Sequence, residues 1–182
     1  MGGEDHALVE QVLSGDEGAF EDLVRRYQTA IYYLALRFVK EEGVAADLVQ
    51  TAFLKVFEGL KSFRRQSSFK TWLYSIAINL CKNYLRDHGK KKWDRLDEMD
   101  PASTANPLRQ LIEREDQQLL EQAWKKLPER QRFTVSLKVH EGLKYREIAE
   151  VMGCSVGTVK ANFHHACTRL KTMLREERDE MP

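Results

Sequence analysis

The sequence predicts an all-α protein with two small helical domains joined by a flexible linker. Apolar residues recur at three- and four-residue spacing along nearly the whole chain, and no segment alternates apolar and polar residues as a strand would. A stretch of prolines and small polar residues interrupts this pattern past the middle of the chain. The last third reads as a helix, a tight glycine turn and a second helix, which is the helix-turn-helix arrangement.

Length and composition agree with this fold class. The chain has 182 residues, enough for one domain or two small ones, with 42% hydrophobic and 31% charged residues, as in soluble globular proteins. No apolar run approaches the roughly 20 residues of a membrane span, so we expect no membrane insertion, and the N-terminus lacks the features of a signal peptide. Three widely spaced cysteines argue against a disulfide framework and favour a cytoplasmic protein.

Apolar periodicity places the expected helices. They cover residues 16–40, 44–61, 67–89, 111–127, 128–140 and 144–152, and a last helix begins after Ser155. Two prolines and no sustained apolar period mark the stretch between the third and fourth helices as a linker. We therefore expect domains at residues 1–92 and 113–182, with the linker at residues 93–112.

Charge is distributed unevenly, although the net charge is only +1. Residues 61–95 carry 10 basic and 2 acidic residues, whereas residues 1–60 carry 5 basic and 11 acidic residues. One short basic segment in an otherwise acidic or balanced chain suggests a local contact with a polyanion. A solvated surface is the plainer alternative.

The second expected helix carries an unusual exposed stripe. Asp47, Gln50, Leu54 and Glu58 recur at helical spacing opposite the buried residues Ala52, Phe53 and Val56. An apolar residue among polar ones suggests a protein contact, but single exposed leucines are common on any surface. The pattern alone leaves both interpretations open.

The third expected helix and the loop before it concentrate amides and cations. The helix begins with a serine cap, and its buried stripe is expected to contain Phe69, Trp72, Leu73, Ile76, Leu80 and Tyr84. Amides can hydrogen-bond base edges and cations can hold phosphates, so the opposite face is a candidate nucleic-acid surface. Its residues are Arg64, Arg65 and Ser67 in the loop and Asn79, Lys82, Asn83 and Arg86 on the helix.

The last helix has the pattern of a DNA-reading helix. Ser155 is a good N-cap, and Val156, Val159, Phe163, Ala166 and Leu170 form one apolar face. The residues left for DNA are Ser155, Thr158, Lys160, Ala161, Asn162, His164 and His165. A metal site is not expected, because Cys154 and His164 lie roughly 15 Å apart along a helix axis. We expect Cys167 to be a small buried apolar residue.

Four stretches in order give the chain a family resemblance. They are "GDEGAFEDLVRRYQTAIYYLALRFV", "AADLVQTAFLKVF", "FRRQSSFKTWLYSIAINLCKNYLRDHGKK" and "LPERQRFTVSLKVHEGLKYREIAEVMGCSVGTVK". Together they resemble the extracytoplasmic-function sigma factors, which are two-domain subunits of bacterial RNA polymerase. The resemblance covers about 85% of the chain. It omits the linker and the two ends.

The resemblance implies a function and a set of roles. Asp47, Gln50 and Leu54 would dock on the coiled coil of the largest subunit of core RNA polymerase. The loop with Arg64, Arg65 and Ser67 and the face of the following helix would read the −10 element of promoter DNA, and the last helix would read the −35 element. An anti-sigma factor is a further implied partner. No cofactor and no catalysis are expected.

Two positions depart from the family pattern. Family members often have an acidic residue where Asn83 stands, which affects base preference there. The stretch "TVKANFHHA" has alanine, asparagine and histidine where many members have arginine and serine, so the helix offers fewer cations to phosphates.

Two other functions remain open at this stage. Residues 111–182 could be the output domain of a free-standing helix-turn-helix regulator, with residues 1–95 as a sensor or dimerisation module. The chain could also be a helical scaffold without DNA. Neither alternative accounts for the basic segment at residues 61–95, whereas a second DNA contact does.

Overall fold

The computed structural model describes residues 2–63, 66–88 and 119–179, and all regular structure in these ranges is helical. The N-terminal half contains α1 (Gly2–Leu13), α2 (Glu17–Val39), α3 (Glu42–Gly59), the short 3-10 helix η1 (Leu60–Ser62) and α4 (Phe69–His88). The C-terminal half contains a helical stretch at residues 119–126, α6 (Glu129–Val135), the π-helix η3 (Ser136–His140), α7 (Tyr145–Met152) and α8 (Val156–Asp179). The predicted linker, residues 93–112, lies outside the described residues.

Local signals in the sequence set the helix boundaries. The Asp16 carboxylate accepts hydrogen bonds from the backbone N–H groups of Gly18 and Ala19 and so caps α2. At the other end, Lys40 adopts a left-handed conformation with φ of 60°, which turns the chain into α3. Gly142 and Gly153 have φ of 67° and 63°, values that glycine adopts without strain, and these residues end η3 and α7.

Helix α1 is not predicted from the sequence, and a buried polar contact holds it in place. The Asp5 carboxylate accepts hydrogen bonds from the Tyr27 hydroxyl at 2.6 Å and from Arg26 Nη1 at 2.7 Å, both on α2. Burial, followed by the hydrogen bond to Asp5, raises the pKa of Tyr27 well above its ordinary value, so the phenol remains a donor. The apolar periodicity of α1 is too weak to indicate a helix without this partner.

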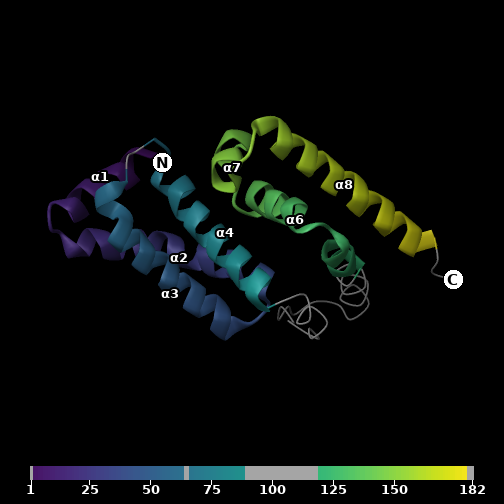
Figure 1. Ribbon diagram of the computed structural model, residues 1–182, viewed down its shortest axis with the longest axis horizontal. Coiled ribbons are helices and arrows are strands. Elements are labelled where there is room, and N and C mark those ends of the chain that lie inside the picture. The colour runs from purple at the N-terminus through teal and green to yellow at the C-terminus, as the bar shows by residue number, and fades with distance from the viewer. Residues whose placement is uncertain (1, 64–65, 89–118, 180–182) are drawn as a thin grey trace, which may run out of the picture.

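One hydrophobic core extends through both halves. In the N-terminal half it contains Leu23, Ile31, Leu34, Val56, Leu73 and Ile78, and it continues into the C-terminal half through Phe133, Leu137, Leu143, Ile148 and Val159. Figure 1 shows the reason: α4 lies between the α2–α3 pair on one side and the C-terminal helices on the other. The two predicted helical units are therefore in close contact in this structure.

The buried surface of α4 is wider than the predicted stripe. Phe69 and Leu73 are buried as expected, but Trp72, Ile76, Leu80 and Tyr84 are only half-buried. Other buried positions are Tyr74, Ala77, Ile78 and Cys81. A stripe prediction assumes one packing partner, whereas α4 has α2 and α3 on one side and α7 on another.

Two predicted buried residues on α8 are exposed. Cys167 lies in solvent, and Val156 is 36% exposed at the first turn of the helix. The reason is that α8 contacts the rest of the molecule through α6 and α7, and the apolar stripe of the helix is narrower than predicted, with Val159 and Ala166 as its buried members. Cys81, in contrast, is fully enclosed, and burial raises the pKa of its thiol to about 12.

The exposure of these two cysteines predicts their reactivity. In the native protein at pH 8, Cys167 reacts with iodoacetamide and Cys81 does not, because Cys81 is enclosed and its thiol remains protonated. Alkylation followed by peptide mass spectrometry measures this, and alkylation in denaturant, where both thiols must react, is the control. Equal labelling of both residues in the native protein would contradict the packing of α4.

Candidate nucleic-acid interface

Helix α3 presents the predicted stripe to solvent. Asp47, Gln50 and Leu54 are all exposed, and the Leu54 side chain is 58% exposed. Phe57, one turn further along, is 54% exposed, and its ring meets that of Phe20 edge to face at 5.1 Å. Phe57 is not among the residues predicted from the sequence, although its spacing of three residues from Leu54 indicates the same face. The stripe therefore contains two neighbouring large apolar side chains, which favours a protein contact over a solvated surface.

Helix α4 exposes three of its four predicted DNA contacts. Asn79, Asn83 and Arg86 are exposed, and Arg86 Nε lies 2.9 Å from the Asp87 carboxylate, in an ion pair that solvent weakens. Lys82 is different. It is half-buried, and its amine lies 5.7 Å from the centre of the Phe133 ring on α6. Burial lowers the pKa of Lys82, which is a neighbour of Asn79 and Arg86 on α4 but is less exposed than the other three residues.

The loop before α4 is described only in part. Arg64 and Arg65 lie outside the described residues, and Ser67 is half-buried. A serine cap is predicted for this helix, and Ser68 provides it, since its hydroxyl accepts the backbone N–H of Thr71 at 3.0 Å. Before the loop, the Phe63 ring stacks on Trp72 at 4.7 Å between centroids. These two contacts fix where the loop leaves η1 and where it enters α4.

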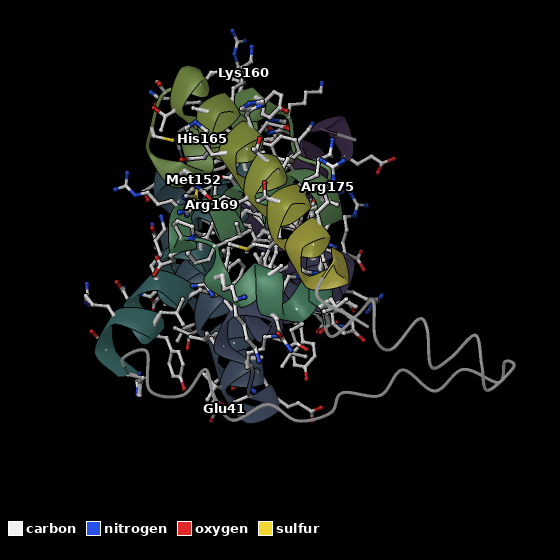
Figure 2. All side chains as sticks on the ribbon, turned by 90° about the vertical axis from the view of Figure 1, so that its right-hand side faces the viewer. Glu41, Met152, Lys160, His165, Arg169 and Arg175 are labelled. Atoms are coloured by element: carbon white, nitrogen blue, oxygen red, sulfur yellow. The ribbon has the colours of Figure 1, made fainter. Side chains whose placement is uncertain are left out.

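Helices α7 and α8 form the predicted helix-turn-helix. The Ser155 hydroxyl accepts the backbone N–H of Thr158 at 3.1 Å, which confirms the predicted N-cap and fixes both residues at the start of α8. Val159 and Ala166 are buried, while Lys160, Ala161, His164 and His165 are exposed and Asn162 is half-buried. Figure 2, in which α8 faces the viewer, shows Lys160 and His165 on this helix.

Further cations on α8 extend this surface. Arg169 is exposed and stands four residues after His165, so the two side chains are neighbours on one side of the helix. Lys171 and Arg175 are exposed further along. These three cations are not among the DNA contacts predicted from the sequence.

The described part of the chain contains neither a metal-binding cluster nor a membrane-spanning helix. No group of three or more histidine, cysteine, aspartate or glutamate side chains there is arranged to hold a metal ion. The rings of His164 and His165 are 6.2 Å apart between centroids and tilted relative to one another. No helix among the described residues is long and apolar enough to cross a bilayer.

Two known families match separate parts of the chain. Residues 23–91 match the family described as Sigma-70 region 2, and residues 117–170 match Sigma-70, region 4. The RNA polymerase sigma-H factor of Pseudomonas aeruginosa is 39% identical over 173 residues, which is 90% of each chain. The ECF RNA polymerase sigma-E factor of Escherichia coli is 38% identical over 172 residues, covering 89% of this chain and 90% of that protein.

Solved structures have the same fold. The structure of CnrH in complex with the cytosolic domain of CnrY superimposes with a TM-score of 0.71 at 25% identity, covering 95% of this chain and 98% of that one. The sigma factor RpoE of Bartonella quintana, in complex with the anti-sigma factor NepR, gives a TM-score of 0.67 at 25% identity over 86% and 96% of the two chains. The chain belongs to the extracytoplasmic-function group of sigma-70 family RNA polymerase sigma factors.

Proposed function

We propose that this protein is an alternative sigma factor that binds bacterial core RNA polymerase and directs it to specific promoters. The observation that carries the proposal is the similarity to RNA polymerase sigma factors along 90% of the chain, with both the region 2 and the region 4 families matched. The chain would act in the cytoplasm, where polymerase and chromosome are located. It would supply recognition, while the polymerase supplies the catalysis.

The alternative of a free-standing regulator is less favoured. It requires the N-terminal half to be a sensor or dimerisation module, whereas residues 23–91 match Sigma-70 region 2. The sigma-factor function also gives a role to the basic face of α4, which a sensor module has no need for.

Docking on core polymerase is assigned to the exposed stripe of α3. Asp47 and Gln50 provide polar contacts, and Leu54 with Phe57 provides the apolar area that anchors an interface. The stripe lies opposite the buried side of α3, so it is held on a rigid helix and is available in the free chain.

Reading of the −10 element is assigned to α4 and the loop before it. Asn79 and Asn83 can hydrogen-bond base edges, and Arg86 can contact phosphate. Arg64, Arg65 and Ser67 belong to this proposal because cations can contact phosphate and polar side chains can hydrogen-bond an unstacked base. Lys82 can join this face only when its amine leaves the Phe133 ring.

Reading of the −35 element is assigned to the start of α8. Lys160 can reach phosphate or guanine, and Ala161 can contact a thymine methyl group in the major groove. His164 and His165 are exposed on the adjoining surface, and Ser155, Thr158 and Asn162 complete the proposed set. Arg169 adds a cation one turn beyond His165.

An anti-sigma factor is the further partner we propose. Support comes from the Bartonella relative, whose structure was solved with the anti-sigma factor NepR bound. The identity of such a partner for this chain is a matter for affinity capture with the full chain as bait.

Run-off transcription tests the proposal directly. Purified core polymerase is combined with the full chain on a set of genomic promoter fragments, with core polymerase alone as the control. Discrete transcripts that depend on the added chain are expected. Their absence on every fragment, with a chain that is folded by circular dichroism, would rule out the sigma-factor function.

The α3 stripe yields the first functional prediction. Asp47→Arg combined with Leu54→Glu should weaken binding to core polymerase by about 30-fold or more, since a central apolar anchor is lost and a charge is reversed. Fluorescence titration of core polymerase with labelled chain measures this. Leu13→Glu, which places the same charge on an exposed leucine of α1, is the matched control and should bind normally. Normal binding by the double variant would move the docking site elsewhere.

The α4 face yields a prediction that separates phosphate contacts from base contacts. Arg86→Ala should weaken open complexes equally on all promoters and reduce the salt dependence of binding by about one charge. Asn79→Ala or Asn83→Ala should instead change base preference at one position, at a cost of about 1–3 kcal/mol for the preferred base. Open-complex formation on a library of −10 variants measures both effects. If all three substitutions lower affinity uniformly, this face holds the backbone and does not read sequence.

The exposed surface of α8 yields the third functional prediction. Lys160→Glu should weaken binding of the holoenzyme to a promoter that depends on its −35 element by about 1 kcal/mol or more, because one phosphate or guanine contact is lost. The internal control is the same promoter with a scrambled −35 element, on which the variant and the native chain should bind alike. An equal loss on both promoters would place Lys160 outside the −35 contact.

A further inference from the structure

The first turns of α8 carry one permanent charge and two side chains whose charge depends on pH. Between Ser155 and Cys167 the sequence has one lysine, Lys160, no arginine and no acidic residue, together with His164 and His165. Lysine is charged throughout the physiological pH range, whereas histidine is the side chain that ordinarily changes its charge between about pH 5 and pH 8. Protonation of both histidines therefore raises the charge of this segment from +1 to +3.

The two histidines lie on opposite edges of the exposed face of α8. Successive residues of a helix point about 100° apart, and the two rings are tilted and separated by 6.2 Å between centroids. Lys160 stands one turn before His164 on one edge, and Arg169 stands one turn after His165 on the other. Figure 2 shows His165 and Arg169 on the same side of the helix. Each edge therefore combines one permanent cation with one histidine.

Small residues occupy the middle of this face. Gly157 and Ala161 are exposed between the two edges, and a methyl group at Gly157 would meet only the Ser155 hydroxyl, at 3.6 Å. A helix about 10–12 Å across fills a major groove about 12 Å wide, and small residues on its leading face let it approach the base pairs closely. In that position the two edges of the face point toward the two phosphate backbones.

Among the described residues, neither histidine forms a hydrogen bond or an ion pair with another residue, so both rings are available to DNA. The elements packed against α8 are α6, α7 and the stretch at residues 119–126. Of their carboxylates, Glu121 pairs with Lys40 at 3.1 Å and Glu147 accepts the backbone N–H of Lys144 at 2.6 Å. The other charged side chains on these elements are Glu129, Glu150, Lys125, Lys126, Arg130, Arg132 and Arg146.

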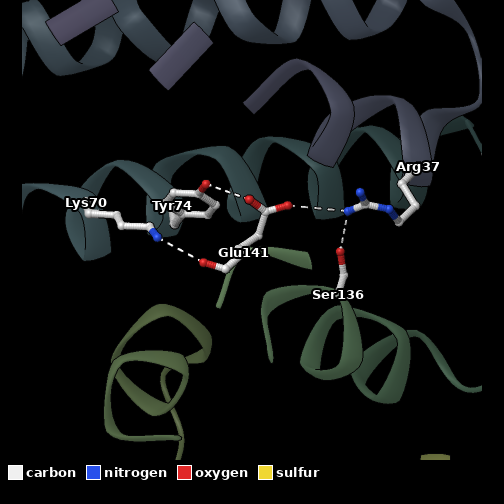
Figure 3. A network of polar contacts seen from close by, with 5 residues as sticks. All are labelled: Arg37, Lys70, Tyr74, Ser136 and Glu141. Carbon is white, nitrogen blue, oxygen red and sulfur yellow. Dashed lines mark hydrogen bonds and ion pairs between the residues drawn. The ribbon is translucent and has the colours of Figure 1, made fainter. Parts of the chain in front are cut away.

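His140 is the other histidine of the C-terminal half, and its surroundings are different. It ends η3 next to a polar network, shown in Figure 3, in which the Glu141 carboxylate accepts the Tyr74 hydroxyl at 2.7 Å and lies 3.5 Å from Arg37 Nη1. Loss of hydration, followed by the charge of Arg37, lowers the pKa of His140. This histidine therefore takes up its proton at a lower pH than an ordinary histidine does, and it serves as a control position.

We infer that binding of the −35 element is coupled to protonation of His164 and His165, which contact phosphates on the two sides of the major groove in their charged form. The inference rests on the proposed function and adds to it that promoter binding strengthens as the pH falls from about 8 to about 6. The sign follows from linkage: DNA phosphates favour the charged form, so protons are taken up on binding, and the gain is lost as the pH rises. A contact that favours the charged form of an ordinary histidine about tenfold strengthens binding about sixfold over this range.

Binding of the holoenzyme to promoter DNA at pH 8 and pH 6 tests the inference. Fluorescence anisotropy measures the affinity for a labelled fragment that contains both promoter elements and for a shorter fragment that ends between them. The ratio of the two affinities should rise about sixfold for each histidine, while effects of pH on the polymerase, His6 and His88 act on both fragments and cancel. A ratio above one that is equal at both pH values would overturn the inference and leave the proposed function intact. A ratio of one at both pH values would contradict the proposed −35 contact as well.

Variants with fixed charge should give opposite results. His164→Gln combined with His165→Gln keeps both positions neutral and should bind the longer fragment at pH 6 no more tightly than the native chain does at pH 8. His164→Arg combined with His165→Arg keeps both positions charged and should bind at pH 8 at least as tightly as the native chain does at pH 6. His140→Gln is the matched control and should keep the native pH dependence. Native pH dependence in the double glutamine variant, with helicity intact by circular dichroism, would overturn the inference.

The salt dependence of binding identifies the group that the histidines contact. Each phosphate that a protein cation neutralises adds about 0.9 to the slope of log affinity against log salt concentration. For the longer fragment, the slope of the native chain should be steeper at pH 6 than at pH 8 by up to about 1.8, because two more phosphates are neutralised. The double glutamine variant should have the same slope at both pH values. A native slope that does not change with pH would overturn the inference, since the histidines would then make no charged contact with phosphate.

Discussion

The packing of α4 between the two halves is the interaction on which the rest of the structure depends. Leu73 and Ile78 of this helix lie in the core shared with α2 and α3, while Tyr74 donates to Glu141 of the C-terminal half. One helix therefore carries part of the N-terminal core, the proposed −10 face and the contact with the helix-turn-helix. A change in how α4 is packed alters all three at once.

The proposed functional surfaces are the sides of the helices that stay exposed when the opposite sides pack into the core. One side of α3 and one side of α8 are buried, and α4 is buried on more than one side. The exposed residues of these helices are held in position by a rigid helical backbone. Leu54 and Phe57 on α3 show this clearly, because large apolar side chains stay in solvent while Phe53 and Val56 of the same helix are buried. Recognition residues placed in this way need little ordering when a partner binds.

Charged side chains also differ according to whether they lie in solvent or in the contact between the two halves. Exposed cations such as Arg86, Lys160 and Arg169 cost little in the free chain because water solvates them. Lys82 and Glu141 instead lie in the contact between the halves, where burial lowers the pKa of Lys82 and hydrogen bonds hold the Glu141 carboxylate.

The sequence by itself determined the helical class, most helix boundaries, the cap at Ser155 and which side of α3 faces solvent, because periodicity and capping act over a few residues. Only the tertiary structure decided what depends on distant partners. It showed that α1 is held through Asp5 and Tyr27, that Phe57 joins the α3 stripe, that Cys167 is exposed and that Lys82 lies under Phe133. No local pattern records the contact of Glu141 with Tyr74 and Arg37, since its residues lie 67 and 104 positions apart in the chain.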